Sequence, residues 1–479
     1  MKTALALALI LPLAAGASVP SKSATSKAPK AAAKKTSAPK ATEEKAPKAP
    51  PRRELDPKVF AVVEHTLANG LKVRLIESHA VPTVSYYTFF RAGSRNERPG
   101  ITGIAHLFEH MMFNGAAKYG PKEFDRVLES AGGTSNAYTS NDMTAYYEDF
   151  ASNALETVID LESDRMRSLA ITPETLASER EVVKEERRFR VDNDVPGMLD
   201  EALSAAIWKA HPYHWPVIGW MGDLDAITRE DALAFFRTYY APNNATIVAV
   251  GDLDPQATIR LIEQKYGDIP AGPPVPPVVN SEPAPNGERR VFVEYPSQAP
   301  SVMIGYKVTE AKDADTFVLD VVQAVLASGE SSRLVKRLVY EEELATHVSV
   351  DFGWRIDPSS FVIFAELPPG GDPRKVEAAI YEELARIAKE GIPERELRKA
   401  KNGLRAHFLE EIATHNGRAH AIGHYELLLG DWRETMRTLE RYDQVKSADA
   451  KRVSARYFET KNRSVATLIP TAAAPAKKK

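Results

Sequence analysis

The pattern of hydrophobic and polar residues predicts a series of strands and helices that occurs twice along the chain, in the same order. In the first segment, alternating residues flank a turn at Asn69-Gly70, which predicts a β-hairpin, and residues 81–90 (VPTVSYYTFF) predict the next strand. The elements expected after it are a helix between Gly103 and Asn114, a helix from Pro121 to the residue before Gly132-Gly133, two strands within residues 134–150, and two more helices.

The second segment repeats this order. Residues 289–296 and 299–308 predict two strands, and helical spacing follows them. The remaining expected elements are helices at 316–327 and 332–342, strands at 345–354 and 359–367, and helices that begin at Pro373 and Pro393. Both segments also close with similar sequences, FFRTYYAPNNATIVAV (235–250) and VSARYFETKNRSVATLI (453–469), so we infer an internal duplication.

Strands followed by pairs of helices, without strict βαβ alternation, indicate an α+β fold. We expect two homologous domains, residues 56–268 and residues 288–470, each a mostly antiparallel sheet packed with helices. The proline-rich segment 269–287 (IPAGPPVPPVVNSEPAPNG) is the predicted linker between them.

Composition narrows the possible functions only slightly. The 479 residues are 43% hydrophobic and 27% charged, and the net charge of −3 carries no basic signature of nucleic-acid binding. We therefore expect no nucleic-acid partner. The chain has no cysteine, which excludes disulfides, thiolate metal sites and a lipoprotein anchor. Any bound metal must be held by His, Asp or Glu.

The N-terminus predicts export. Lys2 precedes an apolar run from Ala4 to Ala15, and small residues at 15–17 suit cleavage near Ala17. We expect a signal peptide at 1–17 and a periplasmic or secreted mature protein; the alternative is an uncleaved anchor. No segment is long and apolar enough for an integral membrane span. Residues 18–53 are rich in Lys, Ala and Pro and predict a disordered tether, and residues 471–479 predict a similar tail.

Residues 105–113 (AHLFEHMMF) place two histidines four residues apart with a glutamate just before the second. At about 100° per residue, His106, Glu109 and His110 share one helix face. Two imidazoles at this spacing can bind one Zn²⁺, and Glu109 can take a proton from the metal's water as that water attacks a carbonyl. The order H-x-x-E-H is the inverzincin signature. The alternative is three polar residues that share a helix without a metal, so a third ligand is the test.

The predicted helix at 173–190 supplies candidates for the third ligand. Thr172 is suited to cap it and Pro173 to occupy its first turn. Glu179 and Glu186 are seven residues apart and share a face, which Val182 and Val183 are expected to turn inward. Glu181 and Glu185 point elsewhere and are expected to be solvated.

Three separated motifs, GSRNERPGITGIAHLFEHMMFNG, GGTSNAYTSNDMTAYY and EREVVKEE, resemble the pitrilysin, insulinase and mitochondrial processing peptidase family of zinc metallopeptidases. The resemblance extends from about Val62 to Pro470. It implies the LuxS/processing-peptidase-like metallohydrolase fold, with a catalytic zinc peptidase domain at 56–268 and an inactive homologous domain at 288–470.

Carried over residue by residue, the resemblance assigns one Zn²⁺ per chain to His106, His110 and Glu186. Glu109 becomes the general base that activates the zinc-bound water, and Glu179 supports a ligand. The implied substrate is a peptide or an unfolded polypeptide held as an added β-strand, with contacts from Asn136 and Ala137.

The second domain departs from this pattern. Its helix at 316–328 contains no histidine, and alignment of Pro173 with Pro393 places Lys399 opposite Glu179 and Ala406 opposite Glu186. We therefore expect it to enclose substrate without a second active site.

Two other pairs of histidines stand out. His420 and His424 are also four residues apart, but Gly423 occupies the position of the base, so we expect surface or interface roles. His211 and His214 are expected to be structural.

Family peptidases close a chamber from four such repeats, and this chain has two, so a homodimer or a heterodimer with a related subunit is implied. The sequence supports a zinc-dependent metalloendopeptidase acting on extended polypeptides. The alternative is a noncatalytic metal-binding assembly subunit or a peptide-binding subunit. The intact Glu109 favours the enzyme, because a purely structural zinc site needs no base.

Overall fold

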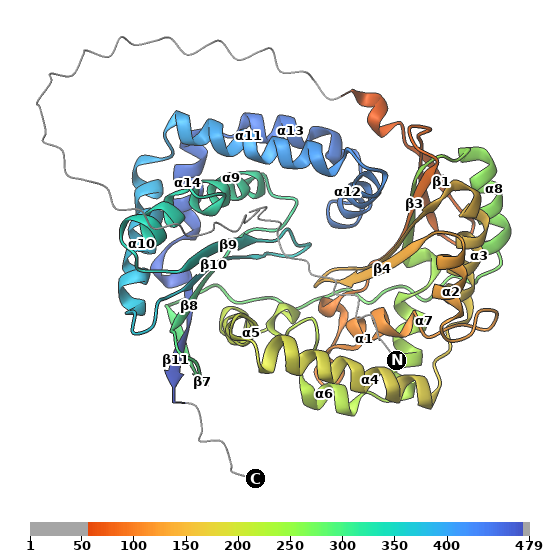
Figure 1. The fold of residues 1–479 in the computed structure, drawn as a ribbon, viewed down its shortest axis with the longest axis horizontal. Helices are drawn as coiled ribbons and strands as arrows, with labels where there is room; N and C mark the ends of the chain where they lie inside the picture. Colours follow the sequence, from red (N-terminus) through yellow and green to blue (C-terminus); the bar gives the residue numbers. More distant parts are fainter. Residues whose placement is uncertain (1–55, 473–479) are drawn as a thin grey trace, which may run out of the picture.

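The computed structural model describes residues 56–472, which form two mixed sheets with helices packed on both (Figure 1). The first sheet has the strand order β1-β2-β6-β3-β5-β4, and only β2 and β6 run parallel. Its strands are β1 (Val63–Thr66), β2 (Lys72–Glu77), β3 (Thr83–Phe90), β4 (Thr134–Thr139), β5 (Thr144–Ala151) and β6 (Ala245–Gly251).

Local sequence signals account for many of the helix boundaries in the first half. Thr172, Asp194, Thr228 and Asp254 each accept a backbone N–H at the start of a helix. The helices are α1 (Ile104–Met111), α2 (Glu123–Ser130), α3 (Leu155–Ser168), α4 (Pro173–Arg187), α5 (Val195–Ile207), α6 (Met221–Ala226), α7 (Arg229–Tyr239) and α8 (Pro255–Tyr266), with a π-helical segment η4 (Arg188–Asp192).

The second sheet has the order β7-β11-β8-β10-β9, and only β7 and β11 run parallel. Its strands are β7 (Arg289–Pro296), β8 (Ser301–Lys307), β9 (His347–Phe352), β10 (Ser360–Glu366) and β11 (Arg463–Thr471). The accompanying helices are α9 (Asp315–Ala327), the π-helical segment η7 (Val335–Glu341), α10 (Pro373–Glu390), α11 (Glu394–Glu411), α12 (His415–Leu428), α13 (Glu434–Gln444) and α14 (Ser447–Tyr457).

Without β1, the strand order of the first sheet matches that of the second, including the single parallel pair. The predicted α+β class, with two mostly antiparallel sheets, is confirmed. Helix α1 begins directly after Gly103, as predicted, but ends at Met111, before the predicted boundary at Asn114.

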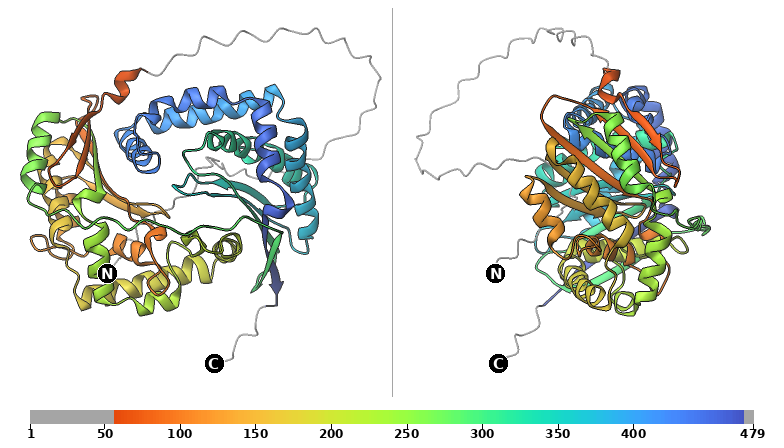
Figure 2. Two further views of the ribbon diagram at one scale, coloured as in Figure 1. Left: turned by 180° about the vertical axis from the view of Figure 1, so that it is seen from behind. Right: turned by 90° about the vertical axis from the view of Figure 1, so that its right-hand side faces the viewer.

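Each half contributes one helix to the sheet of the other half. Helix α12 packs on β3 and β6 of the first sheet, and α5 packs on β7, β8 and β11 of the second (Figures 1 and 2). Glycines permit both contacts. A Cβ atom on Gly423 would lie 1.9 Å from the Phe89 ring, and one on Gly305 would lie 2.5 Å from Ile207 Cδ1. At Gly423 a side chain would clash with the Phe89 ring, whereas at Gly305 it would displace the end of the Ile207 side chain.

Ion pairs and hydrogen bonds reinforce this contact between the halves. Arg95 forms an ion pair with Asp357, and Asp142 Oδ2 accepts the backbone N–H of Ile356 at 2.9 Å. The buried Glu426 on α12 accepts from Lys72 Nζ at 2.7 Å on β2. The two sheets are therefore joined by apolar and polar contacts together.

The proline-rich segment 269–287 contains no helix or strand, and its second part is bound to the first half. Glu282 accepts the backbone N–H groups of Lys209, Ala210 and His211 at 2.8–3.1 Å. The predicted signal peptide, tether and most of the tail lie outside the described residues. Within residues 56–472, no helix is long and apolar enough to cross a membrane.

The packing at Gly423 predicts a stability effect. Gly423→Val should destabilise the protein by about 1–3 kcal/mol, because the added methyl groups would clash with Phe89 and force α12 from the first sheet. Urea unfolding of the variant and the parent measures this change. The matched control is Gly403→Ala on α11, where an added Cβ meets nothing within 4 Å, so stability should be unchanged or slightly higher. Equal stability of Gly423→Val and the parent would contradict the packing.

Candidate metal centre

The start of α1 is fixed by an acidic residue that lies outside the helix. The buried Glu97 carboxylate accepts the backbone N–H groups of Gly103 and Ala105, each at 2.9 Å. Burial raises the pKa of Glu97 well above its usual range, although these two hydrogen bonds oppose the rise. Gly103 has φ 89°, and a Cβ there would lie 2.5 Å from the carbonyl oxygen of Ile218, so this position needs glycine.

A second acidic residue anchors the turn before α1. Asp223 on α6 accepts from the Thr102 hydroxyl at 2.7 Å and from the backbone N–H of Gly100 at 3.0 Å. Sequence reasoning missed both Glu97 and Asp223. Glu97 lies within one of the quoted motifs, whereas no local signal connects Asp223 to a helix more than 100 residues away.

The two faces of α1 differ as predicted. Its apolar side chains, Ile104, Leu107, Phe108 and Met111, are fully buried. On the other face, His106 is buried, and Glu109 and His110 are half-buried. Helix α1 contacts α4 and also packs against β4. The polar face therefore lies between a helix and a sheet edge.

Helix α4 brings Glu186 to this face. Thr172 accepts the backbone N–H of Thr175 at 3.1 Å, which confirms the predicted cap. Val183 is buried as predicted, but Val182 is 46% exposed, so the prediction that both valines face inward is wrong for Val182. Glu181 and Glu185 are exposed, as expected.

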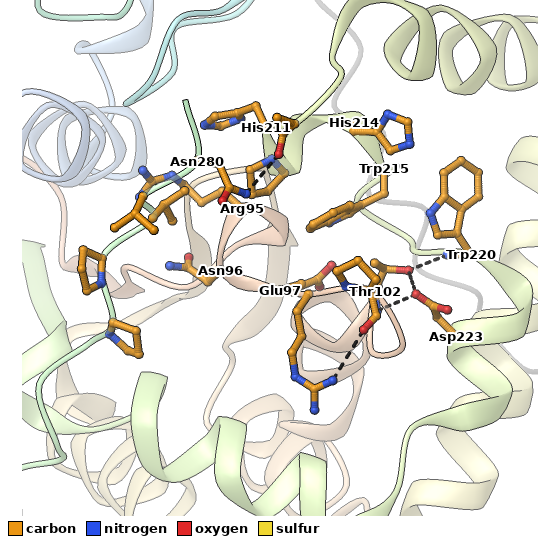
Figure 3. Close-up of a pocket in the computed structure, with 18 of the residues that line it drawn as sticks. Arg95, Asn96, Glu97, Thr102, His211, His214, Trp215, Trp220, Asp223 and Asn280 are labelled. Atoms are coloured by element: carbon orange, nitrogen blue, oxygen red, sulfur yellow. Dashed lines mark hydrogen bonds between the residues drawn. The ribbon is translucent and has the colours of Figure 1, made fainter. Parts of the chain in front are cut away.

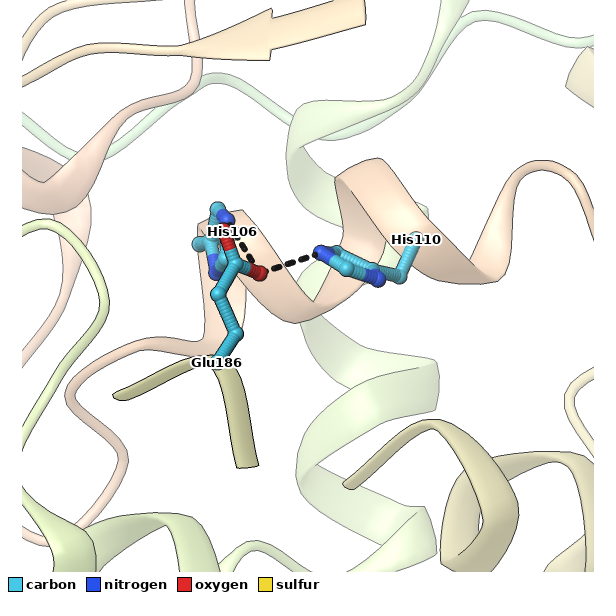
Figure 4. Close-up of side chains that lie close together, drawn as sticks. All are labelled: His106, His110 and Glu186. Atoms are coloured by element: carbon cyan, nitrogen blue, oxygen red, sulfur yellow. Dashed lines mark ion pairs between the residues drawn. The ribbon is translucent and has the colours of Figure 1, made fainter. Parts of the chain in front are cut away.

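Figure 4 shows the result of this packing. Glu186 Oε2 lies 3.2 Å from His110 Nε2 and 3.7 Å from His106 Nε2. Ligand atoms of the three residues lie within 4.8 Å of one another, and no other group in residues 56–472 meets this description of a metal-binding cluster. The structure thus brings together three side chains that span 80 residues of sequence.

The charges of these groups are strongly coupled. Burial alone would lower the pKa of His110, but Glu179 and Glu186 outweigh it and raise that pKa to about 9. Burial alone would raise the pKa of Glu186, but His110, His106 and Arg190 lower it to about 2. Burial is the largest influence on His106 and lowers its pKa. The carboxylates of Glu179 and Glu186 therefore favour a positive charge beside them, at His110.

These residues fit a zinc ion. Tetrahedral coordination at about 2.0–2.1 Å separates neighbouring donor atoms by roughly 3.3 Å, close to the distances from Glu186 to the two imidazoles. His106 Nδ1 is buried and has no hydrogen-bond partner in the described residues, so burial disfavours a protonated ring. A neutral imidazole is the form that binds a metal.

Two charged residues lie beside the candidate ligands. Glu179 Oε2 lies 3.6 Å from His110 Nδ1, the nitrogen on the side of the ring away from Glu186. A carboxylate in this position orients a metal-binding imidazole. Arg190 Nε forms an ion pair with Glu186 Oε1 at 2.9 Å, while Oε2 faces the histidines. The two oxygens of Glu186 therefore have different partners.

Within residues 56–472, the Glu109 side chain forms no hydrogen bond or ion pair. Burial acts to lower the pKa of the neighbouring His106 and His110, and the charge of Glu109 opposes this effect. Strand β4 is the edge of the first sheet and carries Asn136 and Ala137. Asn136 Oδ1 accepts the backbone N–H of Ala137 at 2.9 Å. The backbone N–H of Ala137 on this edge strand is therefore satisfied by a side chain.

The other histidines lie away from this cluster. His211 is buried, with Nε2 3.0 Å from Asp357 Oδ2, and His214 Nδ1 lies 3.0 Å from the carbonyl oxygen of Trp208. Both make structural contacts. His420 contacts Glu411 at 3.1 Å, and His424 is half-buried, with a pKa lowered to about 3 by burial. Both are on α12, at the contact between the halves.

A cavity of about 780 Å³ lies on another side of the α1 start (Figure 3). Its lining includes Trp215, Trp220, Asp223 and the proline-rich segment at Asn280. None of His106, His110 and Glu186 lines it. Trp215 donates to the carbonyl oxygen of Ser94 at 3.0 Å, so the wall of the cavity also supports the turns before α1.

Residues 288–472 contain no equivalent cluster of candidate metal ligands. Helix α9, the counterpart of α1, contains no histidine, and Lys399 on α11 donates to the Ser331 hydroxyl at 2.7 Å. Two family models match the chain. The family model described as "Insulinase (Peptidase family M16)" matches residues 72–219, and the model "Peptidase M16 inactive domain" matches residues 226–404. The chain belongs to peptidase family M16.

Relatives in the M16 family extend over most of the chain. The zinc protease PqqE of Helicobacter pylori is 31% identical over 413 residues, covering 85% of this chain and 92% of the relative. A probable mitochondrial-processing peptidase subunit beta of Arabidopsis thaliana is 23% identical, covering 85% and 78%. The crystal structure of a protease from Helicobacter pylori has a TM-score of 0.83 at 30% identity, covering 85% and 99%. These matches confirm the family that the three motifs indicated.

The geometry predicts graded effects on metal binding. Glu186→Gln should weaken zinc binding by more than about 100-fold, because a ligand is lost, and Glu179→Gln by about 10–100-fold, because His110 loses its orienting carboxylate. Zinc titration against a competing chelator measures both. Glu185→Gln, an exposed residue of the same helix, is the control and should bind like the parent, with one zinc per chain. Parent-like affinity of Glu186→Gln would exclude it as a ligand.

Proposed function

We propose that the protein is a zinc-dependent metalloendopeptidase that hydrolyses peptide bonds in extended or unfolded polypeptides. The observation that carries the proposal is the convergence of His106, His110 and Glu186 within 4.8 Å, with an unpaired Glu109 on the same helix face. Relatives described as zinc proteases support this chemistry. In this proposal the three residues hold one Zn²⁺ per chain.

Zinc, when bound, would polarise the scissile carbonyl and lower the pKa of water. The chain's own residues supply the proton transfer. Glu109 Oε accepts a proton from the attacking water and returns it to the leaving amine, as a general base that then acts as an acid. Glu179 keeps His110 oriented through Nδ1, and Arg190 holds the outer oxygen of Glu186.

The substrate would be held as an extra strand on β4. A substrate carbonyl would accept the N–H of Ala137 in place of Asn136 Oδ1, and the released amide of Asn136 would bind the peptide backbone. Backbone pairing of this kind selects extended chains over folded proteins. This is why we propose unfolded polypeptides and peptides as the substrate class.

We propose residues 56–268 as the catalytic domain, 269–287 as the linker and 288–470 as the noncatalytic partner domain that encloses substrate. We further propose that residues 1–17 are removed on export to the periplasm or the exterior, because Ala4 to Ala15 is apolar and small residues follow. The active form is a homodimer or a heterodimer with a related subunit.

The central test is the variant Glu109→Gln. It should keep about one zinc per chain, since Glu109 is not a ligand, and lose peptide hydrolysis by about 10²–10⁴-fold, since the proton acceptor is removed. Metal analysis and cleavage of an unfolded polypeptide, followed by mass spectrometry, measure the two properties. The matched control Glu181→Gln, exposed on α4, should keep both.

If the parent holds zinc but cleaves no unfolded peptide, even with candidate partner subunits, the protein is instead a noncatalytic metal-binding or peptide-binding subunit. If Glu109→Gln cleaves as fast as the parent, the proposed base is wrong.

The proposed dimer has its own test. Light scattering coupled to gel filtration should give twice the chain mass for active fractions, or a mixed complex when a related subunit is added. Peptidase activity per chain should fall when dilution separates the subunits. A fully active monomer would contradict the proposed dimer.

A further inference from the structure

One loop of the second half reaches the first half close to the start of α1. This loop, residues 353–359, joins β9 to β10, and we call it the β9–β10 loop. Its Asp357 side chain forms an ion pair with Arg95, and Asp357 Oδ2 lies 3.0 Å from His211 Nε2 (Arg95 and His211 are labelled in Figure 3). The backbone N–H of Ile356 donates to Asp142 Oδ2 at 2.9 Å. The loop therefore enters a cluster of polar side chains that belong to the first half.

The β9–β10 loop is itself fixed on the second half. The Arg355 carbonyl oxygen accepts the backbone N–H of Ala311 at 2.8 Å. Trp354 Nε1 donates to both carboxylate oxygens of the buried Asp320 on α9, at 3.1 and 3.2 Å. Asp357 is thus carried by a loop whose position is set by the strands and helices of its own half.

The contact between Asp357 and Arg95 joins two largely buried charges. Only 15% of the Arg95 side chain and 29% of the Asp357 side chain are exposed. Burial alone would raise the pKa of Asp357, but His211 and Arg95 lower it, so the carboxyl group is ionised at neutral pH. Asp142 Oδ1 lies 3.3 Å from Arg95 Nε as a second partner. Removal of one member of such a group leaves the other charges poorly compensated.

The turn that carries Arg95 also holds the start of α1. This turn, η2 (Ser94–Asn96), ends at Glu97, whose backbone N–H donates to the carbonyl oxygen of Ser94 at 3.2 Å. The Arg95 side chain faces the β9–β10 loop. The Glu97 carboxylate accepts the backbone N–H of Ala105, the residue before the first candidate ligand, at 2.9 Å. One short hydrogen-bonded turn therefore connects the loop of the second half to the metal-binding helix.

We propose that Asp357 is a positioning residue for the metal centre: through Arg95 and Glu97 it fixes the start of α1, and with it the position of His106. The inference rests on the metal centre of the proposed function. Its physical basis is a contiguous series of ion pairs and hydrogen bonds between the two halves. The second half thus contributes to metal affinity through this loop, although none of the candidate ligands lies in it.

Zinc affinity tests the proposal. Asp357→Ala should weaken zinc binding by about 3–30-fold in a titration against a competing chelator, because Arg95 loses its partner in the loop. Asp357→Asn keeps an acceptor oxygen without the charge and should recover part of the affinity. Parent-like zinc affinity of Asp357→Ala would overturn the inference.

Two controls break other contacts between the halves. Glu426→Gln removes a buried carboxylate of α12 that accepts from Lys72 on β2, and Arg433→Gln breaks an exposed ion pair with Glu64 on β1. Both should bind zinc like the parent, even where Glu426→Gln lowers stability. An equal loss of affinity in these controls would show a general loosening of the two halves and would overturn the specific role of Asp357.

A double-variant comparison tests the route through Arg95. If Asp357 acts through Arg95, the double variant Asp357→Ala/Arg95→Gln should bind zinc no more weakly than Arg95→Gln alone. Additive losses of affinity would show two separate effects and would overturn the proposed route.

Hydrogen exchange separates this inference from the proposed function, because it needs no metal. In metal-free protein, a peptide covering residues 98–106 should exchange at least about threefold faster in Asp357→Ala than in the parent, since the N–H groups that Glu97 accepts lose protection. Glu426→Gln and Arg433→Gln should match the parent in this peptide. Failure of the parent to bind zinc would contradict the proposed metal centre and leave this readout intact. Parent-like exchange of residues 98–106 in Asp357→Ala would overturn the inference.

Discussion

The exchange of α5 and α12 between the two sheets is the contact on which the rest of the structure depends. Each helix buries its apolar side against strands of the other half, and glycines at 305 and 423 allow the approach. The chain that carries Glu186 passes from α4 through η4 directly into α5. Because α5 is fixed on the second sheet, the second half determines the end position of the helix that carries a candidate metal ligand. The second half contains none of the candidate metal ligands, but through α5 it helps to position the helix that carries Glu186.

The candidate metal centre is supported by polar contacts at the start of α1 and near the end of α4. Glu97 and Asp223 hold the start of α1, and Arg190 holds Glu186 near the end of α4. The carboxylate of Glu97 is buried and that of Asp223 is partly buried. An unpaired charge in such a position would be costly. The result is a cluster of two carboxylates and two imidazoles that favours a cation, which is the electrostatic requirement for holding a divalent metal.

Periodicity and capping predicted much of the fold. Strands β7 to β10, the cap at Thr172 and the helices that begin near Pro373 and Pro393 follow from local sequence, because turns, caps and alternation act over a few residues. Val182 was misjudged for a physical reason: helical spacing says which residues share a face with Glu186, but not how far the partner helix covers that face. Helix α1 begins where it was predicted, after Gly103, and the Glu97 carboxylate that accepts the N–H groups of Gly103 and Ala105 there lies outside the helix.

The sequence alone determined the family, the repeated order of elements and the identities of the candidate ligands, because each depends on residue types at set spacings. Only the tertiary structure decided that Glu186 lies within a few ångströms of both imidazoles, that α5 and α12 cross between the sheets, and that Asp223 anchors α1. These are contacts between distant segments, and they depend on how whole surfaces pack. The burial of His106 is a consequence of that packing.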